Sequence, residues 1–146
     1  MPTLTTTITE SITINGSVRG STNTLTTADI LDVFERNVTV PTSEVTLYST
    51  HASSVAGATF DKDLIKYARF TNLDGTNFID LRVTNENNDE FVYRVYAGQT
   101  FVLHSHVGSM NGTENAAAGL PNGDIISVEA QANTAACSVE IFVASA

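Results

Sequence analysis

The chain has 146 residues, enough for one domain with a hydrophobic core that needs no disulfide. Its formal net charge is -9, and only 16% of its residues are charged against 42% hydrophobic. Its polar character comes mainly from hydroxyl and amide side chains, and the abundant threonine favours strands. This composition argues against a helical bundle, a coiled coil and a disordered acidic tail. Because a phosphate backbone would repel so acidic a chain, we also expect no nucleic-acid partner.

The first predicted element is a threonine-rich hairpin. Residues 3–14 alternate between two faces, as a strand does. One of these faces holds Leu4, Thr6, Ile8, Glu10, Ile12 and Ile14. Asn15-Gly16 follows at once and favours a two-residue turn, since both positions tolerate positive φ. With residues 17–25 as the return strand, residues 1–27 form an arm. A lone hairpin is marginal in water, so the arm must lie against the body or another subunit.

Residues 28–40 allow two interpretations. Thr27 could cap a short helix through Arg36, with apolar residues at helical spacing. Alternatively, Phe34, Arg36, Val38 and Val40 form one face of a strand that ends at the following proline. We favour a strand that begins near Val33.

Alternation continues through the rest of the chain. We expect strands at residues 45–50, 64–73, 78–84, 91–96 and 100–107, with Asp74-Gly75 as the turn between two of them. Strands at 125–132 and 137–144 would form a final hairpin. Cys137 lies on the apolar face of its last strand, so we expect a buried thiol and no disulfide.

Many short strands separated by turn signals predict an all-β fold. We expect a single-domain antiparallel β-sandwich of jelly-roll-like type over residues 28–146. The N-terminal β-hairpin of residues 1–27 would extend from the same unit. No run of apolar residues is long enough to span a membrane, and the N-terminus has no basic and apolar leader. We therefore expect neither a membrane partner nor a secretion signal.

One motif suggests a metal. In Gly98-x5-His104-x-His106 the two histidines would point the same way from a strand. The motif resembles the first half of the cupin metal motif, but the carboxylate that cupins place a few residues later is missing. His51 or Glu114 would have to complete a site. We therefore expect no metal and no other cofactor, and we expect both histidines on the polar face of their strand.

The sequence carries no pattern typical of an enzyme. It has no nucleophile elbow, no glycine-rich phosphate loop and no EF-hand spacing. Sugar binding is an alternative, because β-sandwiches often carry it. The chain has no tryptophan, so Tyr48, Tyr67, Tyr93 and Tyr96 are the possible platforms.

Four segments resemble small virion structural proteins of tailed bacteriophages, including phages of marine cyanobacteria. They are residues 64–77 (LIKYARFTNLDGTN), 97–103 (AGQTFVL), 130–143 (AQANTAACSVEIFV) and 34–41 (FERNVTVP). The resemblance implies a non-enzymatic capsid decoration or cement protein, made in the host cytoplasm and placed on the capsid surface of the virion. It supplies no catalytic residue.

The same resemblance implies two partners, the major capsid protein and further copies of this chain, with a homotrimer favoured. The arm is the element we expect to reach a partner, with Leu4, Ile8 and Ile12 packing across subunits. The alternative function is a virion-associated module that binds sugars or a receptor.

Overall fold

The computed structural model describes residues 1–51, 60–113, 118 and 121–146, and these residues form strands without any helix. The strands are β1 (Leu4–Thr9), β2 (Ile12–Ile14), β3 (Ser17–Arg19), β4 (Thr22–Thr27), β5 (Asp32–Val40), β6 (Val45–His51), β7 (Phe60–Asp61), β8 (Ile65–Asn72), β9 (Ile79–Asn85), β10 (Glu90–Val95), β11 (Thr100–Leu103), β12 (Ile125–Ala132) and β13 (Cys137–Ser145). In this part of the chain no helix has the length and apolarity that crossing a membrane requires.

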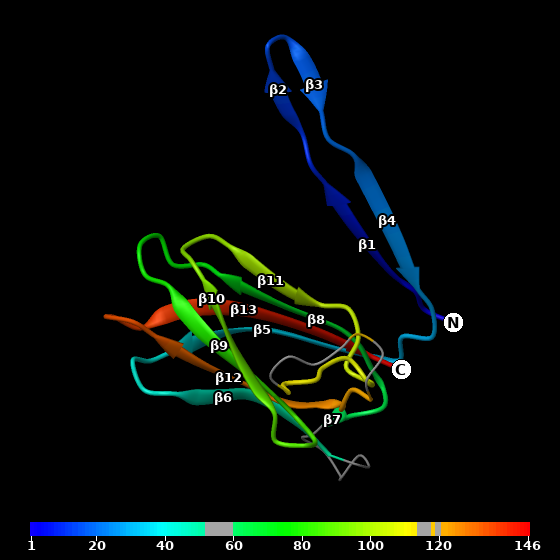
Figure 1. The fold of residues 1–146 in the computed structure, drawn as a ribbon, viewed down its shortest axis with the longest axis vertical. Helices are drawn as coiled ribbons and strands as arrows, with labels where there is room; N and C mark the ends of the chain where they lie inside the picture. Colours follow the sequence, from blue (N-terminus) through cyan, green and yellow to red (C-terminus); the bar gives the residue numbers. More distant parts are fainter. Residues whose placement is uncertain (52–59, 114–117, 119–120) are drawn as a thin grey trace.

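Two sheets packed face to face form the body of the molecule (Figure 1). One has five strands in the order β10-β9-β12-β6-β7, and the other has four in the order β11-β8-β13-β5. Their neighbouring strands are antiparallel, apart from the short parallel pair β6 and β7. The predicted all-β sandwich is confirmed.

The core lies between the sheets and follows the alternation of the sequence. In β9, Ile79, Leu81 and Val83 are buried and alternate with partly exposed polar residues. Phe70 in β8 is the largest fully buried side chain on the facing sheet. Cys137 is also buried, as predicted, and desolvation raises the pKa of its thiol.

The segment with two interpretations is a strand. β5 pairs with β13 along its whole length, from Val40 opposite Cys137 to Asp32 opposite Ser145. Val40 is buried, and Phe34 and Val38 pack against the core. The apolar face of β5 is therefore buried in the sandwich as a strand, and no helix forms.

The predicted final hairpin is wrong. β12 and β13 follow one another in the chain, but they belong to opposite sheets. The same holds for β8 and β9, which the Asp74-Gly75 turn connects. Alternation of apolar and polar residues shows only that one face of a strand is buried. Strands of both sheets in a sandwich bury one face, so alternation does not reveal which strand pairs with which.

Strands β1 to β4 form the N-terminal arm. It projects from the end of the sandwich where the two chain termini lie (Figure 1). Its outer half, β2 and β3, stands well clear of the body.

Candidate interaction surface of the N-terminal arm

The arm is a long antiparallel hairpin with one register. Leu4 lies opposite Thr27 at its base, and Ile14 lies opposite Ser17 at its tip. Between β1 and β2 the ladder is interrupted, but the Glu10 N–H still donates to the Ser21 carbonyl at 2.9 Å. Asn15 and Gly16 have φ angles of 51° and 79°, as the predicted two-residue turn requires. The predicted hairpin is confirmed.

The two faces of the arm differ in chemistry, because residues directly opposite each other share a face. One face carries Ile8, Ile12, Ile14 and Leu25, with polar residues such as Glu10, Arg19 and Asn23 between them, and we call it the aliphatic face. The other face consists mainly of threonine: Thr5, Thr7, Thr9, Thr13, Thr22, Thr24 and Thr26. Hydroxyl oxygens pair across its strands, at 3.3 Å between Thr7 and Thr24 and at 3.2 Å between Thr9 and Thr22.

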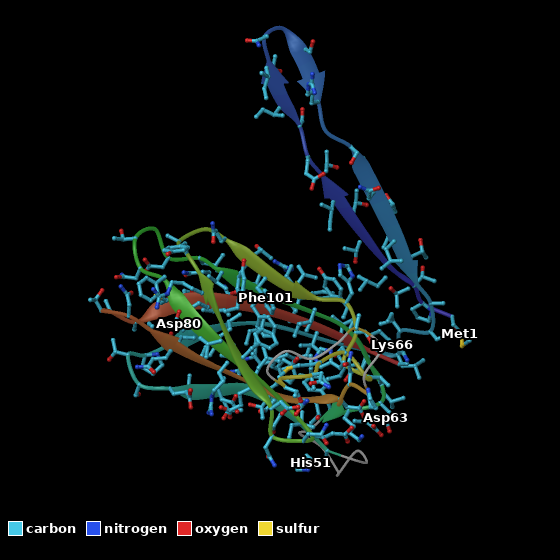
Figure 2. All side chains as sticks on the ribbon, viewed as in Figure 1. Met1, His51, Asp63, Lys66, Asp80 and Phe101 are labelled. Atoms are coloured by element: carbon cyan, nitrogen blue, oxygen red, sulfur yellow. The ribbon has the colours of Figure 1, made fainter. Side chains whose placement is uncertain are left out.

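The aliphatic face is largely open to solvent, and Figure 2 shows the outer part of the arm projecting away from the body. Ile8, Ile12, Ile14 and Leu25 are 47%, 56%, 48% and 49% exposed. Single exposed apolar residues are ordinary on a protein surface, whereas several of them gathered on one face of a projecting hairpin indicate an interaction site. The aliphatic face is therefore the best candidate for a functional surface.

The base of the arm is anchored to the outer side of the four-stranded sheet. Leu4 packs against the buried cluster of Ile30, Tyr67 and Ala144. The Ile30 N–H donates to the Pro2 carbonyl at 3.1 Å. Thr6 hydrogen-bonds with Tyr67, and burial raises the pKa of that tyrosine. These contacts fix where the arm leaves the body.

A groove lies in the angle between the arm and the body. Its volume is about 270 Å³, and its lining residues are Thr6, Ile8, Asn23, Thr24, Leu25 and His104. Ile8 and Leu25 are its apolar lining residues, and the other four carry polar groups. The aliphatic face of the arm thus extends into the groove through Ile8 and Leu25.

The structure separates the three residues that the sequence suggested for the interface. Ile8 and Ile12 lie on the exposed aliphatic face, whereas Leu4 is half-buried and packs within its own chain. Ile14 and Leu25 belong to the surface but were not among the three. The two-residue turn could have revealed Leu25. A hairpin with this turn pairs Thr6 with Leu25, and paired residues share a face.

The histidine pair does not form a site. β11 ends at Leu103, so the strand predicted to reach residue 107 is too long. His104 is exposed and lies edge-on to Tyr67, with ring centres 5.6 Å apart. His106 is fully buried, and its Nε2 is hydrogen-bonded to the Tyr48 hydroxyl. The predicted placement of both histidines on the polar face is therefore wrong for His106, because the chain leaves the sheet before His104 and strand alternation no longer applies.

Burial controls the protonation of the His106–Tyr48 pair. Desolvation lowers the pKa of His106 to about 4 and raises that of Tyr48. The Nδ1 atom of His106 has no hydrogen-bond partner among the described protein atoms. The imidazole is therefore neutral at neutral pH and acts as part of the core.

No other residues gather into a metal centre in the described ranges, where no group of three or more His, Cys, Asp or Glu side chains is placed to hold an ion. His51 ends β6 and is exposed. Glu114, the other residue considered for a site with His104 and His106, lies outside the described residues.

Many of the carboxylates form ion pairs. Lys62 contacts Asp124 and, at 3.0 Å, Glu86. The hydrogen bond from Lys62 is the main reason that the pKa of Asp124 is lowered. On the five-stranded sheet, Arg82 contacts Glu90 at 2.8 Å. These pairs connect neighbouring strands and loops.

A second apolar surface lies at the edges of the two sheets. Tyr93 in β10 stacks on Phe101 in β11, with ring centres 4.8 Å apart and planes inclined by 27°. Phe91 lies 6.4 Å from the same ring. Phe91 and Tyr93 are 36% and 49% exposed. Sequence reasoning suggested Tyr93 as a platform but missed the two phenylalanines, because only the packing of the sheets brings these edge strands together.

The fold and these surfaces define an all-β sandwich that carries a projecting β-hairpin. No family model matches the chain, and no curated protein matches it. The function therefore has to be inferred from the residues of this chain.

Proposed function

We propose that the protein is a non-enzymatic structural protein of a bacteriophage virion, of the capsid decoration or cement type. In this role it binds the major capsid protein on the outside of the head as a homo-oligomer, with a trimer favoured, and stabilises contacts between capsomers. The observation that carries the proposal is the arm with its exposed aliphatic face. Exposed apolar side chains gathered on one face are typical of a surface that a protein partner covers.

The segments that resemble phage virion proteins support the proposal through their positions. Residues 34–41, 64–77, 97–103 and 130–143 contain most of β5, β8, β11 and β13. These four strands make up one sheet. The resemblance thus extends over a continuous structural layer, which is the layer on which the arm is anchored.

We also propose that the sandwich is a jelly roll. Its main strand orders are β5-β13-β8-β11 in one sheet and β6-β12-β9-β10 in the other. The consecutive strands β5 and β6, β10 and β11, and β12 and β13 lie in opposite sheets. This order is expected when paired strands wind around a common core. Jelly rolls are frequent in viral capsid domains and in lectins.

The direct test is a reconstitution. Purified full-length protein is added to capsids that lack it, and electron microscopy measures its occupancy at symmetry-related positions. We expect saturable, symmetric decoration and a higher temperature of capsid disruption. The same assay on a chain that lacks residues 1–25 should show weaker binding. Absence of binding by the full-length protein would contradict the proposal.

The aromatic cluster favours a second candidate, a virion-associated module that binds sugars. Exposed aromatic rings such as Tyr93 can stack on a sugar face. Of the other tyrosines considered, Tyr48 and Tyr67 are buried, and Tyr96 packs edge-on against Phe78. A glycan array separates the candidates. Binding that Tyr93→Ala abolishes would support the sugar module, whereas a blank array alongside capsid decoration would reject it.

A further inference from the structure

We infer that the arm is a hinged lid, which swings about its base and closes over the outer face of the four-stranded sheet. In the open position seen in this structure the aliphatic face is exposed. In the closed position the body of the same chain covers Ile8, Leu25 and Ile12, so the lid keeps these side chains from solvent until a partner opens it. The inference does not depend on the virion role, because the position of the arm is measurable in the purified chain.

The aliphatic face of the arm is turned toward this sheet. Leu4, Thr6 and Ile8 alternate along β1 onto the same face. Leu4 packs against the buried cluster that contains Tyr67, and Thr6 hydrogen-bonds with Tyr67. Ile8 lines the groove together with His104 of the body. The contact between arm and sheet therefore begins at the base, and Figure 1 shows the arm diverging from the sheet further out.

The outer face of the four-stranded sheet has an apolar area next to the base of the arm. The opposite face of these strands packs against the five-stranded sheet. Val102 of β11 and Phe142 of β13 are partly exposed and pack against the cluster that contains Tyr67. Both lie opposite Arg69 of β8, so the three residues form one row across the sheet, which we call the first row. An aliphatic side chain of a closed arm would pack on this row.

The spacing of the arm matches the rows of the sheet. β1 and β8 both lead away from the base of the arm, and Thr6 lies beside Tyr67. Strands in both rise by about 3.3 Å per residue, so equal steps along the two chains stay side by side. Two residues beyond the Thr6–Tyr67 pair, Ile8 meets the first row. Six residues beyond that pair, Ile12 meets Leu73, which is 46% exposed.

Between these two apolar contacts, the acidic residue of the arm meets polar side chains. Glu10 falls on the row that holds Thr71, Thr100 and Glu140. The hydroxyl oxygens of Thr71 and Thr100 are 3.0 Å apart, and only one of the two hydroxyls donates to the other. The second hydroxyl is left to donate to the Glu10 carboxylate, while Glu140 is already paired with Arg69. Apolar residues therefore meet apolar residues, and polar residues meet polar residues, along the closed lid.

The base of the arm is suited to act as a hinge. Among the described residues one backbone hydrogen bond joins the arm to the body, from the Ile30 N–H to the Pro2 carbonyl. The chain leaves the arm through Ala28 and Asp29, which are exposed, and Asp29 has a φ of 61°. Rotation at these two residues changes the angle of the arm without breaking a strand pair. Beyond Thr6 no described hydrogen bond or ion pair holds the arm at its open angle.

The first test is a cross-link within one chain. Ile12→Cys and Leu73→Cys are combined in the full-length protein, which is oxidised at high dilution, with Cys137 buried and out of reach. An intramolecular disulfide is expected, because closure brings the two Cβ atoms together. Thr13→Cys combined with Leu73→Cys is the matched control and should give none, since Thr13 lies on the other face of the arm. Disulfides only between chains, or the same yield from both pairs, would overturn the inference.

The second test measures how often the lid is closed. Spin labels on Ser17→Cys at the tip and Ser138→Cys on the sheet report the distance between them by pulsed electron paramagnetic resonance. A short distance is expected beside the long one of the open position. Ile8→Thr with Leu25→Thr should lower the ratio of closed to open at least about tenfold. Val18→Thr on the threonine face should leave it unchanged. A single long distance in the otherwise unaltered chain, or an unchanged ratio in the double variant, would overturn the inference.

Discussion

Acid should destabilise the sandwich through His106. In the folded protein burial lowers the pKa of this residue from 6.5 to about 4. The unfolded chain therefore binds a proton between these two values that the folded protein does not bind, so stability falls as the pH falls through this window. The difference between the two pKa values corresponds to roughly 3 kcal/mol of unfolding free energy, lost progressively from about pH 6.5 to pH 4.

The assay is urea unfolding, followed by circular dichroism across this pH window, of the wild type and two variants. His106→Gln removes the buried titrating group, so its unfolding free energy should change less with pH than that of the wild type. The control is His104→Gln, two residues away at an exposed position, which should follow the wild-type curve. The carboxylates contribute equally to the pH dependence of all three proteins, so their contribution cancels when the unfolding free energies are compared.

If His106→Gln and the wild type lose the same stability on acidification, the imidazole is not kept neutral by burial. A pKa near 6.5 for His106 in an NMR titration of the folded protein would lead to the same conclusion.

Three further predictions test the core and the arm. Phe70→Ala should lower the unfolding free energy by roughly 3–5 kcal/mol in urea titrations, since Phe70 is fully buried. Gly20→Ala should speed hydrogen exchange of the Glu10 amide and leave the body's melting temperature unchanged, because the new Cβ would lie 1.9 Å from the Glu10 carbonyl oxygen. The Cys137 thiol should react with an aromatic disulfide reagent only after unfolding, as it is buried; rapid reaction of folded protein would contradict its burial.

Features set by near neighbours in the chain could be predicted from the sequence. The turn at Asn15-Gly16 depends on the φ preferences of two residues, and the structure has it. The buried face of β9 depends on alternation alone, and Ile79, Leu81 and Val83 occupy it. Both features need no knowledge of which strand lies beside which.

Features that depend on distant pairing could not be predicted. β12 and β13 have the alternation of a hairpin, yet each pairs with strands from much earlier in the chain. His106 is buried because Tyr48, far away in sequence, lies beside it. The groove beside His104 exists because the arm is anchored on Tyr67. These contacts join residues that are far apart in the chain, so no local sequence pattern predicts them.

The way in which the arm joins the body determines how the molecule responds to mechanical load. β4 leads through residues 28–31 directly into the nine-residue strand β5. Tension on a tip held by a partner therefore enters the sandwich at the start of β5 and is shared by the whole ladder between β5 and β13. The Leu31 N–H also donates to the Ser145 carbonyl at 2.9 Å, so the last strand takes up load at the same point. The arm thus acts as a tether whose anchor is the longest ladder of the four-stranded sheet.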